Sequence, residues 1–211
     1  MTDSPALVTI LSTSFVVGLS GAAAPGPLLA YTVARTMRQG VWVGPLISVG
    51  HSVIEFAIVM ALAVGLGALL QRPTVGGAVG VVGGAFLLWM GYSMLRMRAS
   101  ETVTATPEAG AAPIFAAAAV TLSNPFWFVW WVTIGSTFLA WSLSKGTAGL
   151  ATFYTGHIFA DFAWYTLVAL LVSRGRSLLA QRWYWGLLRV CGIFLLALGV
   201  WFVVWGVQRL T

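Results

Sequence analysis

Long apolar stretches separated by short polar linkers dominate the chain. A membrane-spanning α-helix needs about 20 mostly apolar residues, and stretches of that size recur with few or no charges inside them. The pattern predicts an all-α integral membrane protein in which residues 1–211 form a single transmembrane domain. Its six predicted transmembrane helices fall within residues 5–34, 41–70, 74–95, 112–141, 147–172 and 185–207.

The composition is typical of a protein that is surrounded by lipid. Hydrophobic residues make up 59% of the 211 residues, and charged residues make up only 8%. Soluble domains carry roughly 25% charged residues. We therefore expect a lipid bilayer around most of the chain.

The positive charges are concentrated in alternate linkers, and this distribution predicts the orientation of the protein in the membrane. The net charge is +6, but the cations lie between the apolar stretches and form no single stripe, so we expect no nucleic-acid partner. Cytoplasmic loops carry an excess of lysine and arginine. The first, third and fifth linkers are the basic ones, which predicts that they are cytoplasmic and that both termini are extracytoplasmic. Their cations are Arg35, Arg38, Arg96, Arg98, Arg174, Arg176 and Arg182.

Two sequence motifs each occur twice, about half the chain apart. Residues 50–55 and 156–161 both begin with Gly-His and carry an acid four positions after the histidine. Residues 84–91 resemble residues 192–199 at nearly the same offset, since the glycines, the phenylalanine and two leucines coincide. Such self-similarity indicates a duplicated unit.

The duplication predicts two three-helix repeats with opposite orientations in the membrane. The first repeat covers residues 5–98, a cytoplasmic linker covers 99–111, and the second repeat covers 112–208. Because each unit holds an odd number of spans, the second must enter the membrane from the opposite face. Inverted-topology repeats are the architecture of many secondary transporters, whose substrate sites lie near the midplane.

The first helix of each repeat contains a motif that should break it. Pro25, Gly26 and Pro27 interrupt the first helix, and Asn124 and Pro125 interrupt the fourth. Proline removes a backbone donor and clashes with the preceding turn. Backbone groups freed in this way are tolerated in a membrane where they face protein or a wet cavity. The motifs therefore predict either a substrate-binding break or a purely structural kink.

Four ionisable residues fall deep inside predicted helices. His51 precedes Glu55 by four positions and His157 precedes Asp161 by four, so each pair shares one helix face. At about 1.5 Å per residue both pairs reach the middle of the bilayer. Intramembrane acids are rare and usually face a bundle interior or a water-filled cavity. We interpret the four as a binding or proton-coupling site; a polar contact that only fixes helix packing is the alternative.

Glycines spaced by four in the third helix allow another helix to approach closely. They are Gly76, Gly80 and Gly84, and small residues at this spacing are common where membrane helices pack. Packing within the chain and a dimer interface are both compatible with the pattern.

Taken in order, these motifs resemble those of the amino-acid exporters of the LysE and RhtB type in the lysine exporter superfamily. The resemblance spans the whole chain. It rests on Pro25-Gly26-Pro27, on Gly40 and Gly44, on residues 84–92, on Asn124-Pro125 and on Asp161.

The resemblance implies a carrier in the inner membrane of a bacterium or archaeon. Such a carrier would export amino acids or related small molecules by proton antiport, as a homodimer and without a cofactor. Two departures bear on the substrate. Phe126 stands where the family usually has a lysine after Asn-Pro, and Gly50, His51 and Glu55 replace a more usual polar pattern.

The leading hypothesis is therefore a proton-coupled exporter. Glu55 and Asp161 would bind a substrate ammonium group or the counter-transported proton, His51 and His157 would relay protons, and the broken helices would supply backbone contacts. A divalent metal-ion exporter is an alternative, because two histidines and two carboxylates suit zinc or manganese. An intramembrane enzyme and a passive channel are further alternatives, and no nucleophile motif favours the enzyme.

Overall fold

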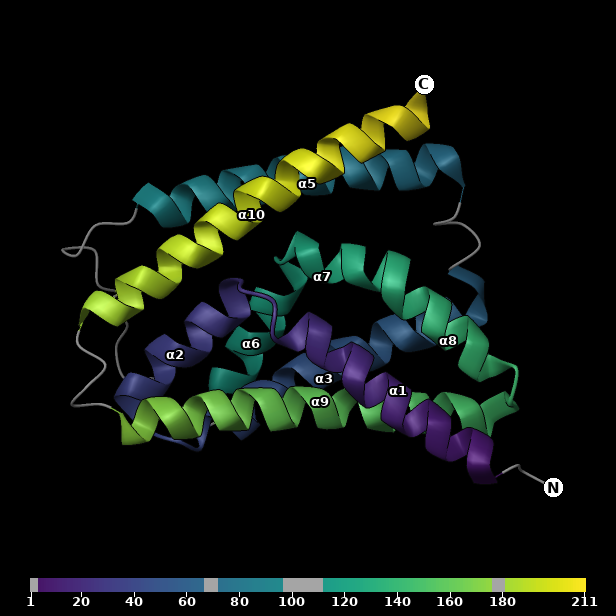
Figure 1. Ribbon diagram of the computed structural model, residues 1–211, viewed down its shortest axis with the longest axis horizontal. Coiled ribbons are helices and arrows are strands. Elements are labelled where there is room, and N and C mark those ends of the chain that lie inside the picture. The colour runs from purple at the N-terminus through teal and green to yellow at the C-terminus, as the bar shows by residue number, and fades with distance from the viewer. Residues whose placement is uncertain (1–3, 67–71, 97–111, 176–180) are drawn as a thin grey trace.

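The computed structural model describes residues 4–66, 72–96, 112–175 and 181–211, and within these ranges it contains helices and no strands (Figure 1). Six of the described segments are long and apolar enough to cross a membrane, namely Ser4–Ala22, Val43–Gly65, Pro73–Arg96, Phe126–Leu143, Gly146–Arg174 and Trp185–Leu210. They coincide with the six stretches expected from the hydrophobic pattern. The prediction of an all-α, multi-pass membrane protein is confirmed.

The first apolar stretch folds as two helices, α1 (Ser4–Ala22) and α2 (Pro27–Gln39), with the Pro-Gly-Pro motif between them. Pro27 occupies the first position of α2, where its missing N–H group costs no helical hydrogen bond. The prediction that Arg35 and Arg38 lie in a linker is wrong, because the helix restarts after the break and includes both. Arg35 is buried, and its Nε donates to the Tyr31 hydroxyl at 3.1 Å.

The fourth stretch is divided in a similar way. α6 (Ala112–Leu122) ends before Ser123, and the chain resumes as α7 (Pro125–Trp130), a π-helical turn η3 (Trp131–Gly135) and α8 (Ser136–Leu143). Asn124 caps α7, since its Oδ1 accepts a hydrogen bond from the backbone N–H of Phe126 at 3.2 Å. The predicted breaks in helices 1 and 4 are both confirmed.

Two helices form the centre of the bundle. α3 (Val43–Ala61) continues into a π-helical turn η1 (Leu62–Leu66) and packs against α9 (Gly146–Arg174). α3 also packs on α6, and α9 packs on α1. Each of these two contacts therefore joins the central helix of one predicted repeat to the first helix of the other.

The glycines of the repeated Gly-His motif allow α6 to approach α3 closely and α1 to approach α9 closely. A Cβ atom added to Gly50 would collide with the backbone carbonyl of Ile114 in α6. One added to Gly156 would collide with the Ser14 hydroxyl in α1. The absence of a side chain at both positions lets the neighbouring helix reach the polar residues that follow.

α5 (Pro73–Arg96) and α10 (Gln181–Leu210) lie side by side along one edge of the molecule, at the top of Figure 1. Facing glycines bring their backbones together. A Cβ on Gly84 would lie 2.8 Å from the carbonyl oxygen of Gly199, and one on Gly91 would lie 2.7 Å from that of Gly192. Gly80 faces the Trp205 ring. Gly80 and Gly84 of the four-spaced stripe thus pack within the chain.

The contact between α5 and α10 is reciprocal. The start of residues 84–91 contacts the end of residues 192–199, and the end of residues 84–91 contacts the start of residues 192–199. A two-fold axis between two copies would produce this pattern. The inverted relation and the boundaries of the two repeats stay predictions, and linker 99–111 lies outside the described residues. The start of α1 and the end of α10 lie on the same side in Figure 1, as six spans require. Their extracytoplasmic location stays a prediction.

Candidate functional site

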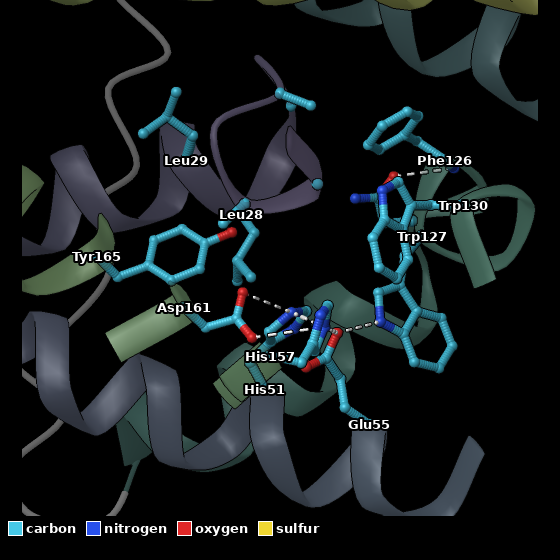
Figure 2. Close-up of a pocket in the computed structure, with 15 residues that line it drawn as sticks. Leu28, Leu29, His51, Glu55, Phe126, Trp127, Trp130, His157, Asp161 and Tyr165 are labelled. Carbon is cyan, nitrogen blue, oxygen red and sulfur yellow. Dashed lines mark hydrogen bonds and ion pairs between the residues drawn. The ribbon is translucent and has the colours of Figure 1, made fainter. Parts of the chain in front are cut away.

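The four ionisable residues predicted to lie deep in the membrane meet between α3 and α9. All four are buried, with exposed fractions of 6% for His51, 2% for Glu55, 2% for His157 and 1% for Asp161. Nε2 of each histidine lies 3.1 Å from Oε1 of Glu55. The histidine nitrogens lie farther from Asp161, at 3.9 Å for His51 and 3.7 Å for His157. The ionisable residues of the two Gly-His motifs therefore form one cluster (Figure 2).

Glu55 is held by tryptophans as well as by histidines. The indole Nε1–H groups of Trp127 and Trp131 donate to Oε1 of Glu55 at 3.1 Å and 3.2 Å. The two tryptophans are one turn apart across the α7–η3 junction and point the same way. Hydrogen bonds to an ionised acceptor are stronger than neutral ones. This set of donors favours Glu55 as a carboxylate anion.

The two histidines differ in the partner of their second ring nitrogen. Nδ1 of His51 lies 2.7 Å from the Thr121 hydroxyl of α6. Nδ1 of His157 is buried without a hydrogen-bond partner, and it would lie 2.9 Å from a Cβ on Gly18 of α1. The ring of His157 is instead packed among aromatic rings, with centroids 4.9 Å from Trp130 and 5.0 Å from Trp131.

Asp161 is the less restrained of the two acids. Its distances to the histidines exceed hydrogen-bonding range, and its Oδ2 has no hydrogen-bond partner. Its backbone carbonyl accepts a hydrogen bond from Ser48 at 3.4 Å, which joins α9 to α3. A buried carboxylate oxygen without a donor costs free energy unless it gains a partner. Asp161 is thus the acid best placed to take up a proton or a cationic group.

The cluster borders a small, partly enclosed chamber with a volume of about 40 Å³. In this conformation the chamber has space for water molecules. Both helix breaks reach it: Gly26 and Asn124 line its wall, and a Cβ on Gly26 would lie 4.0 Å from Nδ2 of Asn124. Figure 2 shows Tyr165 and the α7 tryptophans on opposite sides of the carboxylates.

Most, but not all, of the residues predicted for the site line the chamber. His51, Glu55, His157, Asp161, Gly26 and Asn124 line the chamber. Pro25 and Pro27 shape the break but are not among the lining residues. Pro125 begins α7, and its side chain lies outside the described part of the structure.

Aromatic side chains are the part of the site that sequence reasoning missed. Phe126, Trp127, Trp130 and Tyr165 line the chamber, and Trp131 lies behind Glu55. Anchoring at the membrane interface accounts for tryptophans near the ends of predicted helices, but not for tryptophans in their middle. Trp127 and Trp131 lie inside a predicted helix at a spacing of four, where each indole N–H needs a buried acceptor. That spacing was the available signal.

Three members of the cluster also have the geometry of a metal site. His51, Glu55 and Asp161 each offer one ligand atom, and these atoms lie within 4.8 Å of one another. Zinc sites use such nitrogen and oxygen ligands. Oε1 of Glu55, however, already accepts hydrogen bonds from two indoles.

Comparisons with known proteins agree on one family. The family model for the LysE type translocator matches residues 19–206. The chain is 26% identical over 197 residues to the "Chemotactic transduction protein ChpE" of Pseudomonas aeruginosa, covering 91% of this chain and 96% of that protein. It is 23% identical over 211 residues to the "Putative amino acid efflux protein YcgF" of Bacillus subtilis (strain 168), covering 96% and 99%. No solved structure matches the chain.

Proposed function

Because the chain belongs to the LysE type translocator family, we propose that it exports amino acids or related small metabolites from the cytoplasm in exchange for protons. The relative named for amino acid efflux supports the substrate class. One observation carries the proposal: two acids and two histidines converge on a small buried chamber that both helix breaks also line. Broken helices beside a buried ionisable site are characteristic of secondary transporters.

The two acids would take different roles in the transport cycle. Asp161 would bind the substrate ammonium group or a proton, because neither histidine nitrogen lies within hydrogen-bonding distance of its carboxylate oxygens. Glu55 would provide a fixed negative charge, because two indoles and two histidines surround its Oε1. A histidine ring can accept a proton at one nitrogen and release one from the other, so His51 and His157 can pass protons between such groups. The remaining titratable group that faces the chamber from α9 is Tyr165.

The small chamber volume supports an alternating-access cycle for this carrier. An amino acid does not fit within about 40 Å³, so loading requires the walls to separate. α7 is the suitable moving element, since it lies between the Asn124 break and the η3 π-helical turn. π-helical turns are frequent at functional sites. In this proposal the present conformation is the closed state between inward and outward access.

The alternatives from the sequence are less well supported. The comparisons describe a translocator and an efflux protein, which does not favour the metal-ion exporter, and a translocator family speaks against an intramembrane enzyme. Accumulation against a gradient would separate a carrier from a passive channel. A location in the inner membrane, extracytoplasmic termini and a homodimer complete the proposal.

The direct test uses purified protein in proteoliposomes. A pH gradient across the vesicles should drive transport of a radiolabelled amino acid mixture. Glu55→Gln and Asp161→Asn should each abolish this gradient-driven transport while the protein still unfolds in one cooperative thermal transition in detergent. Ser52→Ala is the matched control, because Ser52 is on α3 and its hydroxyl bonds to the Ser48 carbonyl of the same helix at 2.6 Å. Full transport by both acid variants would overturn the proposal.

A further inference from the structure

The chamber wall carries negative charge and no full positive charge from a lysine or arginine. Of its lining residues within the described ranges, two are acids, two are histidines and none is a lysine or an arginine. An α-amino acid brings a carboxylate as well as an ammonium group. Like charges placed side by side in a buried site oppose binding. The wall is therefore complementary to the ammonium end of such a molecule and not to its carboxylate end.

Aromatic rings supply further contacts of the same kind. Phe126, Trp127 and Trp130 line the chamber from α7, and Tyr165 lines it from α9 (Figure 2). The faces of aromatic rings attract cations, tryptophan most strongly. Carboxylates and aromatic rings together form a surrounding that suits organic cations.

The groups that could receive a substrate carboxylate are weaker or more distant. Asn124 offers only a neutral amide, whose Nδ2 donor carries no full positive charge. The start of α2 offers only a partial positive charge, and Pro27 there has no N–H group. Arg35 follows Leu28 by seven residues, or about 10 Å along α2. Its guanidinium is near the Tyr31 ring, at 5.5 Å from the centroid, and does not line the chamber.

The chemistry of an α-amino acid makes the charge argument stricter. One carbon carries both charged groups, so the carboxylate must enter the site together with the ammonium group. An ammonium group that contacts Asp161 therefore brings the carboxylate close to both acids, whichever way the chamber opens. A simple amine presents its ammonium group alone.

We propose that the substrate of this chain is an organic amine without an α-carboxylate, the class that results from decarboxylation of amino acids. The inference rests on the proposed export function and narrows its substrate class. It follows from the two carboxylates, the aromatic wall and the absence of lysine and arginine among the described lining residues.

Matched pairs that differ by one carboxylate provide the test. Cadaverine is compared with lysine, and agmatine with arginine, in proteoliposomes of the full chain under an imposed pH gradient. Both amines carry two positive charges, which keeps them from crossing the bilayer unaided. We expect each amine to be transported about tenfold faster than its amino acid, the ratio expected for a modest charge mismatch. Protein-free vesicles give the background rate.

A charge introduced at Phe126 should change this preference. Phe126→Lys adds a cation to the chamber wall and should lower the ratio of amine to amino acid transport about tenfold. Phe126→Met removes the ring without adding charge and should retain the preference. If Phe126→Lys does not fold, the wild-type ratios alone decide. Equal or faster transport of the amino acids overturns the inference and leaves the proposed export function standing. No gradient-driven transport of either member of a pair overturns both.

Discussion

The α3 and α9 copies of the Gly-His motif share a glycine, a histidine and an acid at the same spacing but have different surroundings. In the α3 copy, Nδ1 of His51 has the Thr121 hydroxyl as its partner, and Glu55 accepts two indole hydrogen bonds. In the α9 copy, Nδ1 of His157 and Oδ2 of Asp161 have no hydrogen-bond partner. The partners of the two histidines differ because different helices pack on each copy.

This contrast separates fixed groups from available ones. α6 presents Thr121 to the α3 copy, and α1 presents Gly18 to the α9 copy. Buried polar groups without partners are costly, and those that persist in a native protein call for an explanation. Oε2 of Glu55 also lacks a hydrogen-bond partner, so each copy keeps one carboxylate oxygen without a donor, but only the α3 copy has an oxygen that accepts indole hydrogen bonds. We interpret the more restrained α3 copy as the anchor of the site and the less restrained α9 copy as the part that binds and releases its ligand.

The largest expected difference between the copies concerns the length of the acid. Glu55→Asp withdraws the carboxylate from the indoles of Trp127 and Trp131, and a misplacement of about 1 Å can cost about 100-fold in rate. Asp161→Glu should reduce transport much less, because Asp161 makes no close hydrogen bond through Oδ2. Transport rates in proteoliposomes check both. Equal losses in the two variants would remove the distinction between anchor and binding acid.

The next expected effect concerns the tryptophans that hold Glu55. Trp131→Phe removes one donor from a buried carboxylate and should lower the free energy of unfolding by about 2 kcal/mol. Trp130→Phe removes a similar volume, but its indole makes only a 3.5 Å hydrogen bond to Ser20. Chemical unfolding in detergent compares the two. A larger loss for Trp130→Phe would contradict an anchoring role for the Trp131 donor.

A smaller effect is expected when the α3 copy is made to resemble the α9 copy. Thr121→Val keeps the shape of the side chain and leaves Nδ1 of His51 unpaired, which should cost about 1 kcal/mol of unfolding free energy. Thr121→Ser retains the hydroxyl and serves as the control. Nitrogen NMR of His51 should report a changed ring tautomer in the valine variant alone. An unchanged spectrum would mean that Thr121 does not set the tautomer.

The smallest effect is expected at Gly18, on the α9 side. Gly18→Ala places a Cβ 2.9 Å from Nδ1 of His157, so the ring of His157 must shift slightly. The strain should be offset by the higher helix propensity of alanine, about 1 kcal/mol. Thermal unfolding should therefore change little, and a fall in transport would come from the displaced His157 ring. Unchanged transport would show that the position of this ring is not critical.

Features that depend on local sequence could be predicted. His51 and Glu55 share a helix face because they are four residues apart, and the same holds for His157 and Asp161. The breaks at Pro25–Pro27 and Asn124-Pro125 follow from the restricted backbone of proline. The sequence also placed both acids at the same depth, so their meeting near the middle of the bundle could be anticipated.

Features that depend on packing between distant segments could not be predicted. Nothing in the sequence of α3 indicates that Glu55, and not Asp161, would receive the indoles of Trp127 and Trp131. That choice is made by the direction in which α7 leaves the Asn124 break. The burial of Arg35 was missed for a related reason, since the helix that restarts after Pro-Gly-Pro continues beyond the apolar stretch.

The burial of the cluster has a consequence for how the protein responds to its medium. Mobile ions screen exposed charges over roughly 10 Å at ordinary ionic strength, but they screen buried pairs much less. Glu55 and Asp161 are 2% and 1% exposed. The attraction between these carboxylates and a bound cation should therefore be nearly independent of external salt. A carrier built in this way would keep its affinity for its substrate when the salinity around the cell changes.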